Sequence, residues 1–141
     1  MVSKKLRSQI FEKYGGMCCY TGTPLEPDWQ IDHFHPIIRN INAKGCLFPE
    51  DDSINNMVPC QKIINHYKHS LPLETFRTYY LGNLHKRIAK LPRNPRTEKG
   101  MRRKAYLLKV AGFFGITADK PFNGKFYFET LEDRHDPESD T

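Results

Sequence analysis

Three short segments of the chain bring together aspartate, asparagine and histidine residues: Ile31-Asp32-His33-Phe34-His35-Pro36, Asp51-Asp52-Ser53-Ile54-Asn55-Asn56-Met57-Val58 and Asn65-His66-Tyr67-Lys68. These residue types bind hard divalent cations or transfer protons. Their order is an Asp-His pair, then a middle asparagine, then an Asn/His pair on a predicted helix. This order indicates a metal-dependent hydrolytic site.

The first and last segments have the chemistry that phosphodiester hydrolysis requires. One histidine base and one hard cation can activate the water, neutralise the phosphoryl oxygens and assist the leaving oxygen. Asp32 and His33 are adjacent, so on an extended strand their side chains point to opposite faces. One can hold the cation while the other faces the water, if the strand bends or the cation lies at its edge. Asn65 and His69 are four residues apart, hence on one helical face, and can close the site from the opposite element.

The periodicity of apolar residues predicts short strands and helices around these segments. Ser3 can cap a first helix, which Gly15-Gly16 would end. Further helices are predicted from Pro59 to Lys68, from Pro72 to about Ala89 and from Thr97 to about Val110. Short strands are predicted at residues 17–20, 29–33, 55–58 and 124–129, and residues 39–53 read as a long loop.

The composition is that of a small basic protein. The chain has 141 residues, of which 38% are hydrophobic, with a formal net charge of +6. The excess of positive charge favours a polyanionic partner but is weak evidence alone. We expect no membrane segment, because no apolar run approaches the roughly 18 residues that cross a bilayer, and no signal peptide. Cys18, Cys19, Cys46 and Cys60 form no evident disulfide framework, so an intracellular, cytoplasmic location is expected.

Positive charge is concentrated in the second half of the chain. Between Leu81 and Val110 there are ten Lys or Arg residues and one acid, Glu98. A solvated helix surface would explain this charge equally well in isolation, but beside a nuclease-like site phosphate binding is favoured. We expect a core with flanking helices over residues 1–91, a basic helical extension and a core-packed strand over 92–128, and an acidic, disordered tail over 129–141.

Asp32-His33, Asn56 and Asn65, with the spacing between them, resemble the HNH nuclease family. In that family two strands and one helix pinch a single divalent cation. The middle segment followed by Asn65-x-x-Lys68 is similar to the HNH domain of RNA-guided CRISPR nucleases, and residues 58–77 resemble small stand-alone HNH proteins of phage and bacteria. The resemblance covers roughly residues 13–77. It implies an α+β fold, with a ββα-metal (HNH) core, an N-terminal helix and additional C-terminal helices.

The resemblance also implies a role for each residue. Asp32 and Asn65 would be ligands of one Mg²⁺ or Mn²⁺ ion, His33 the general base, and Asn56 the residue that orients the base. His69 matches a further metal-binding histidine of the colicin-type branch. The candidate contacts to nucleic acid are His35, His66, Lys68, Arg77, Arg102, Arg103 and Lys104.

One feature departs from the family pattern. Many stand-alone members hold a structural Zn²⁺ with two Cys-x-x-Cys pairs, whereas those positions here are Cys18, Thr21, Gln61 and Ile64. Three of the four ligands are missing, so we expect structural zinc to be absent and packing by Met17, Tyr20, Ile63 and Ile64 to replace it. A rearranged site formed by Cys18, Cys19, Cys46 and Cys60 is the alternative, although adjacent cysteines chelate poorly.

We therefore expect a DNA endonuclease that acts on double-stranded DNA, as a monomer or a homodimer. One metal and one base serve one strand, so a monomer should nick. A DNA-binding module with an inert nuclease core is the alternative from another class. A zinc-knuckle binding protein is the third, and the broken cysteine pattern counts against it.

Overall fold

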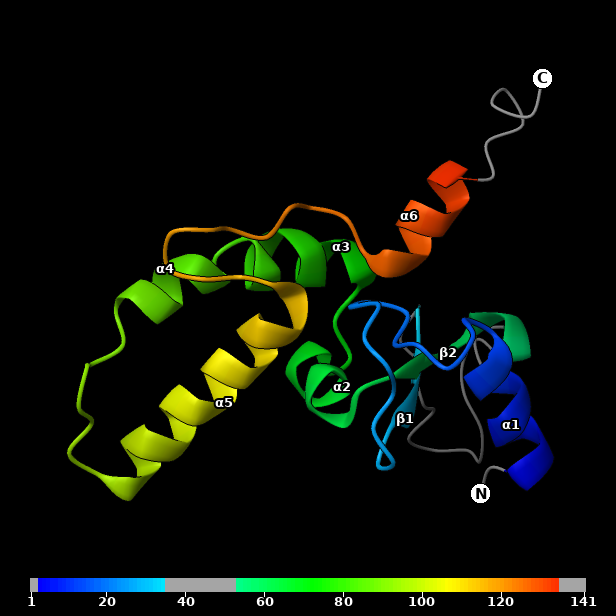
Figure 1. The fold of residues 1–141 in the computed structure, drawn as a ribbon, viewed down its shortest axis with the longest axis horizontal. Coiled ribbons are helices and arrows are strands. Elements are labelled where there is room, and N and C mark those ends of the chain that lie inside the picture. Colours follow the sequence, from blue (N-terminus) through cyan, green and yellow to red (C-terminus); the bar gives the residue numbers. More distant parts are fainter. Residues whose placement is uncertain (1–2, 35–52, 135–141) are drawn as a thin grey trace, which may run out of the picture. The chain divides into compact units, whose positions relative to one another are not determined.

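The computed structural model describes residues 3–34 and 53–134. It contains helices and a two-stranded sheet (Figure 1). The predicted α+β class is therefore confirmed as a mixture of helices and strands. The elements in chain order are α1 (Lys4–Glu12), β1 (Gln30–His33), the 3₁₀ helix η2 (Ile54–Asn56), β2 (Met57–Cys60), α2 (Lys62–Lys68), α3 (Leu73–Thr75), the π-helix η3 (Phe76–Leu81), α4 (Leu84–Ala89), α5 (Glu98–Phe114) and α6 (Tyr127–Arg134).

The chain forms two compact units. The first unit contains the described residues up to Leu73 and again from Phe126 onward, and the second unit is Glu74–Lys125. The predicted boundary after residue 91 therefore differs from the observed division. Among the described residues, no helix combines the length and the apolar character needed to cross a membrane.

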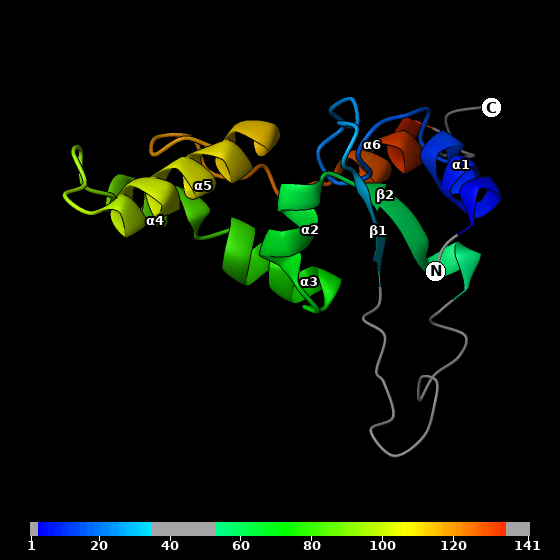
Figure 2. The ribbon, with the colours of Figure 1, turned by 90° about the horizontal axis from the view of Figure 1, so that it is seen from below.

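The sheet of the first unit pairs β1 with β2 in antiparallel register, with Asp32 opposite Val58 and His33 opposite Met57. Helix α1 contacts β2 and helix α2 contacts β1, so the two helices lie on either side of the strand pair (Figure 2). The predicted strand at 29–33 is confirmed, and the strand predicted at 55–58 begins two residues later, at Met57, and ends at Cys60.

Pro59 corrects the predicted start of the following helix. We expected this proline at the first helical position, but it lies in β2 opposite Ile31, and α2 begins at Lys62. A strand at a sheet edge tolerates proline, because the missing N–H would face away from the ladder. On that outer edge the Pro59 carbonyl accepts a hydrogen bond from Cys19 N–H at 3.0 Å.

Helix α1 has the serine cap that its sequence predicts, and it is also attached to the start of β1. The Ser3 side chain accepts a hydrogen bond from Leu6 N–H at 3.1 Å, as expected for a serine N-cap. Arg7 holds the helix to the start of β1, since its guanidinium lies 3.8 Å from the Trp29 ring centroid and donates to the Trp29 carbonyl at 2.7 Å.

The end of the described chain returns to the first unit as a helix, so the predicted strand at 124–129 is wrong. The N–H groups of Tyr127 and Phe128 donate to the carbonyls of Tyr20 and Cys19 at 3.1 and 3.0 Å. The ring centroids of Tyr20 and Phe126 are 5.2 Å apart. This segment therefore contacts the core as a helix, and α6 includes residues that were assigned to the acidic tail.

The strand predicted at 17–20 is also wrong. Its one strand-like pairing is an isolated bridge between Met17 and Pro24, and its later carbonyls bind the start of α6 instead. Gly22 adopts a φ of +71°, and a Cβ there would lie 2.6 Å from the Tyr127 ring. The turn after Tyr20 therefore requires glycine, both for its backbone and for the close approach of α6.

In the second unit the single helix predicted from Pro72 to Ala89 is broken. After η3 the chain turns at Gly82 and Asn83 before α4 begins. A Cβ on Gly82 would lie 2.2 Å from the Thr78 carbonyl oxygen, and the Asn83 amide donates to the Tyr79 carbonyl at 2.8 Å. Helix α5 starts at its predicted Thr97 cap and runs past Val110 to Phe114, where Gly115 with a φ of +71° ends it.

Candidate functional site

Asp32 lies buried on β1, where two donors bind the same carboxylate oxygen. The Tyr20 hydroxyl donates to Oδ2 at 2.5 Å, and the Lys68 ammonium lies 3.2 Å from that atom. The Lys68 side chain is only 1% exposed, and its Nζ also donates to the His33 carbonyl at 3.1 Å. Because a buried ammonium needs a counter-charge, Asp32 holds helix α2 against β1.

Asn65 lies on the same side of the strand as Asp32. Its Nδ2 donates to the Gln30 side-chain oxygen at 2.8 Å, and Gln30 and Asp32 share one face of β1 because side chains alternate along a strand. Asn65 and Lys68 are three residues apart on α2, hence neighbours on one helical face. The structure therefore brings the two predicted metal ligands to one face of the strand.

Asn56 lies in the turn beside His33. It is buried, with 7% exposure, and its carbonyl accepts a hydrogen bond from Phe34 N–H at 3.0 Å. The Lys13 ammonium holds this turn by donating to the carbonyls of Ile54 and Met57 at 3.1 and 2.8 Å. The half-buried His33 follows Asp32 on β1, so strand geometry directs its side chain to the opposite face.

His66 and His69 lie together at the exposed end of α2, with ring centroids 5.3 Å apart. His69 follows the last residue of the helix with a φ of +54°, a region that residues other than glycine rarely occupy. In the described part of the chain, no three His, Cys, Asp or Glu side chains come together as a metal site. Asp32, His33 and His69 therefore do not form a three-ligand centre. His35 lies outside the described residues.

Asp32 and Asn65 offer oxygen donors of the kind that Mg²⁺ prefers. Asp32 uses Oδ2 for Tyr20 and Lys68, and Asn65 donates through Nδ2. Within the described ranges no contact engages the Oδ1 atom of either residue. A pair of oxygen ligands suits a cation that keeps several of its waters. The donor set therefore fits Mg²⁺, although the Lys68 ammonium would lie close to the bound ion.

Several of the predicted nucleic-acid contacts are engaged elsewhere. Lys68 is buried against Asp32, so it cannot bind a phosphate as we expected without giving up that pair. In the second unit, the Arg77 guanidinium binds both carboxylate oxygens of Glu74 at 2.9 and 3.0 Å and the Gly124 carbonyl at 2.7 Å. These bonds fix the orientation of Arg77.

The three consecutive cations of α5 differ from one another. Arg102 and Arg103 are exposed, and Arg102 lies 4.0 Å from Glu98. Lys104 is half-buried and donates to the carbonyls of Pro92 and Arg93 at 3.1 and 2.7 Å. Arg102 and Arg103 are therefore the members of this set whose side chains extend into solvent.

Two of the positions that depart from the expected cysteine pattern, Thr21 and Gln61, are linked through Thr23 by hydrogen bonds. The buried Gln61 amide donates to the Thr23 hydroxyl at 3.0 Å and to the Pro24 carbonyl at 2.7 Å, and accepts from Glu26 N–H at 3.1 Å. The Thr21 and Thr23 hydroxyls are 2.7 Å apart, and Ile64 is fully buried. This network joins the turn after Tyr20 to the start of α2.

Cys18 lies buried beside this network. Burial alone would raise its pKa, but hydrogen bonds from the Cys60 and Thr21 side chains and from the Thr21 and Gln61 backbone lower the pKa of Cys18 to about 6. Burial raises the pKa of both Cys19 and Cys60 well above the usual thiol value. Cys46 lies outside the described residues.

Tyr20 and Gln30 are site residues that the sequence reasoning missed. Tyr20 was expected only to pack in the core, yet it is a hydrogen-bond donor to Asp32. Twelve residues separate the two, and no local pattern relates them. Gln30 could have been found, because it precedes Asp32 by two residues and therefore shares its strand face.

The chain matches no protein-family model, and no curated protein or solved structure matches it. The functional assignment therefore depends on the residues and their geometry alone.

We expect Asp32 and Lys68 to be strongly coupled in stability. Asp32→Asn leaves the Lys68 ammonium buried without a counter-charge. Lys68→Met leaves the Asp32 carboxylate without the positive charge that neutralises it. Each should lower the free energy of unfolding, measured by urea denaturation, by about 3–5 kcal/mol. The double variant should lose clearly less than the sum of the two. Additive losses would contradict the ion pair.

We expect Cys18 to make stability depend on pH. Its folded pKa of about 6 lies below the roughly 8.5 of a free thiol, so the group favours the folded state above pH 8.5. That contribution falls as the pH drops through 6. Relative to Cys18→Ser, the wild type should gain stability between pH 6 and pH 8 in urea titrations under reducing conditions. Parallel pH profiles for the two proteins would exclude a buried thiolate.

Proposed function

We propose that this chain is a metal-dependent endonuclease of the HNH type, which hydrolyses phosphodiester bonds of double-stranded DNA. One observation carries the proposal. Helix α2 is joined to β1 by the Lys68–Asp32 and Asn65–Gln30 contacts, which bring a carboxylate and an amide to one face, next to the histidine that follows. An antiparallel strand pair followed by a helix is the order expected of a ββα-metal core.

Asp32 and Asn65 would hold one Mg²⁺ or Mn²⁺ ion through their Oδ1 atoms. When bound, such an ion neutralises charge on the phosphoryl oxygens and assists the leaving 3′ oxygen. The two ligands belong to a strand and a helix that are fixed to each other, so their separation does not depend on a flexible loop. His69 stays a predicted ligand, and its exposed position at the end of α2 suits a weaker role.

His33 would be the general base that takes a proton from the attacking water. The backbone on its C-terminal side is held at two points, because its carbonyl accepts from Lys68 and the next N–H donates to the Asn56 carbonyl. These contacts limit the rotation of the peptide that follows His33. Asn56 would therefore orient the base through the backbone. One base and one cation act on one strand, so a monomer should nick.

A non-catalytic DNA-binding module is the second candidate function. The observation that favours it is the Lys68–Asp32 ion pair, which places a positive charge beside the proposed metal position. A cation there would be held less tightly than by an unpaired aspartate. Cleavage assays separate the two candidates.

We expect His33→Ala to abolish cleavage while DNA binding is retained, because the substitution removes the base and leaves the basic residues unchanged. The measurement is conversion of supercoiled plasmid to open circles with Mg²⁺, Mn²⁺ or EDTA, wild type beside variant. Gel shifts in EDTA should be equal for the two proteins. If both proteins shift DNA and neither cleaves it with any metal, the inert binding module is the better description.

We expect Asn65→Ala to raise the Mg²⁺ concentration needed for half-maximal nicking by about tenfold or more, since the loss of one ligand weakens the site. The matched control is Gln30→Ala, which frees the Asn65 side chain but keeps its oxygen, and it should have a smaller effect. An Mg²⁺ requirement unchanged by Asn65→Ala would remove this residue from the site.

A further inference from the structure

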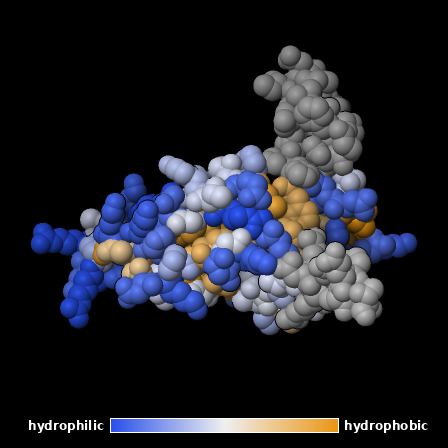
Figure 3. Space-filling model, turned by 90° about the horizontal axis from the view of Figure 1, so that it is seen from above, coloured by the Kyte–Doolittle hydropathy of each residue, from blue (hydrophilic) through white to orange (hydrophobic). Residues whose placement is uncertain are grey.

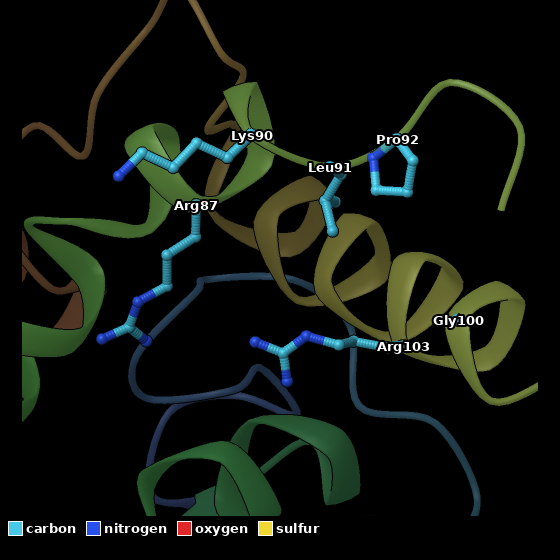
Figure 4. A pocket seen from close by; sticks show the side chains of 6 residues that line it. All are labelled: Arg87, Lys90, Leu91, Pro92, Gly100 and Arg103. Atoms are coloured by element: carbon cyan, nitrogen blue, oxygen red, sulfur yellow. The ribbon is translucent and has the colours of Figure 1, made fainter.

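A cleft of about 350 Å³ opens between α4 and α5 in the second unit. Six described residues line it, of which three are cationic and none is acidic: Arg87, Lys90, Leu91, Pro92, Gly100 and Arg103. Arg87 comes from α4 and Arg103 from α5. Figure 4 shows both guanidinium groups on the same side of the two helices, whereas the Lys90 side chain extends in another direction.

The charge of the second unit makes an anion the natural ligand of this cleft. From Glu74 to Lys125 there are thirteen Lys or Arg residues and three acids, a net charge of +10. The whole chain carries +6, so the rest of it carries −4. Hydrophilic side chains protrude over this unit in the space-filling view (Figure 3). A concentrated field of one sign attracts polyanions.

The rim of the cleft is held in place by the chain's own contacts. Lys104 binds the carbonyls of Pro92 and Arg93, which fixes the segment between the two helices. The Thr97 side chain accepts a hydrogen bond from Gly100 N–H at 3.0 Å, which fixes the start of α5. Arg103 therefore extends from a rigid helix, and a ligand would not have to order this segment on binding.

The aromatic residues near Arg87 favour nucleic acid over other polyanions. The Arg87 guanidinium carbon lies 5.2 Å from the Tyr80 ring centroid and 5.9 Å from that of Tyr79. The two rings are 5.8 Å apart, and Tyr79 is 60% exposed. An exposed aromatic ring beside an arginine suits the sugars and bases of a nucleic acid, which an anionic lipid surface does not offer.

We propose that the α4–α5 cleft binds the phosphodiester backbone of DNA through Arg87, Lys90 and Arg103. The choice of DNA rests on the proposed nuclease function, but binding at the cleft needs neither the metal nor His33. The cleft would supply affinity that depends on salt and not on sequence. Of the ten cations between Leu81 and Val110 for which phosphate binding is predicted, it selects Arg87, Lys90 and Arg103.

The test compares two full-length variants that each lose three positive charges. The cleft variant is Arg87→Gln/Lys90→Gln/Arg103→Gln. The control is Lys86→Gln/Lys99→Gln/Lys109→Gln, which changes exposed residues of the same helices that do not line the cleft. Binding of a fluorescent DNA duplex is measured by anisotropy in EDTA across a salt series, and circular dichroism checks that both variants fold.

The cleft variant should bind the duplex about 10- to 100-fold more weakly, and its log K against log salt slope should be shallower by about 2–3. The control should lose far less. If the two variants lost DNA affinity equally, the attraction would be a diffuse effect of charge, and the proposal that the cleft is a binding site would be wrong. Wild-type binding to phosphatidylserine vesicles that exceeds DNA binding and depends on the same three residues would also overturn the proposal. Plasmid nicking by the wild type is scored separately, so failure of the nuclease proposal remains distinguishable from failure of the cleft.

Discussion

The ion pair between Lys68 and Asp32 is the constraint from which the first unit is built. A fully buried ammonium is tolerable only beside an anion, and in the described part of the chain Asp32 supplies that anion when α2 lies against β1. The same contact places Asn65 near Gln30 and fixes the His33 carbonyl. Docking of the helix and assembly of the candidate site are therefore one event, and the site should not exist in a partly folded core.

Hydrogen bonds to Gln61 support this arrangement from the other end of α2. The amide of Gln61 binds the loop that precedes β1, and Ile64 fills the adjacent space. Three neutral bonds of this kind contribute about 1 kcal/mol each, and they require no metal ion. The loop, the start of the helix and the Cys18 thiol are thus held by contacts within the chain.

The sequence was sufficient to predict an element where a local signal, such as a capping residue, determines it. The Ser3 and Thr97 caps predicted α1 and α5, and the pattern of residues 29–33 predicted β1. Contacts with distant segments decided the rest. The buried position of Lys68 depends on the docking of α2, and Pro59 is tolerated because its strand lies at an edge. The aromatic run at residues 126–128, where α6 begins, resembled a strand. The Glu129 carboxylate nevertheless accepts the Phe126 N–H at 2.9 Å, a capping contact readable from the sequence.

The first unit is discontinuous in sequence, which has a consequence for synthesis on the ribosome. Tyr20 and Cys19 contact residues 126–128, so the core stays incomplete until the whole second unit has been translated. Chains generally fold domain by domain as they emerge, and here the second unit can fold before the first unit closes. A truncated product that ends within the second unit would lack part of its core. Such a chain would carry most of the positive charge of the second unit but an incomplete candidate site.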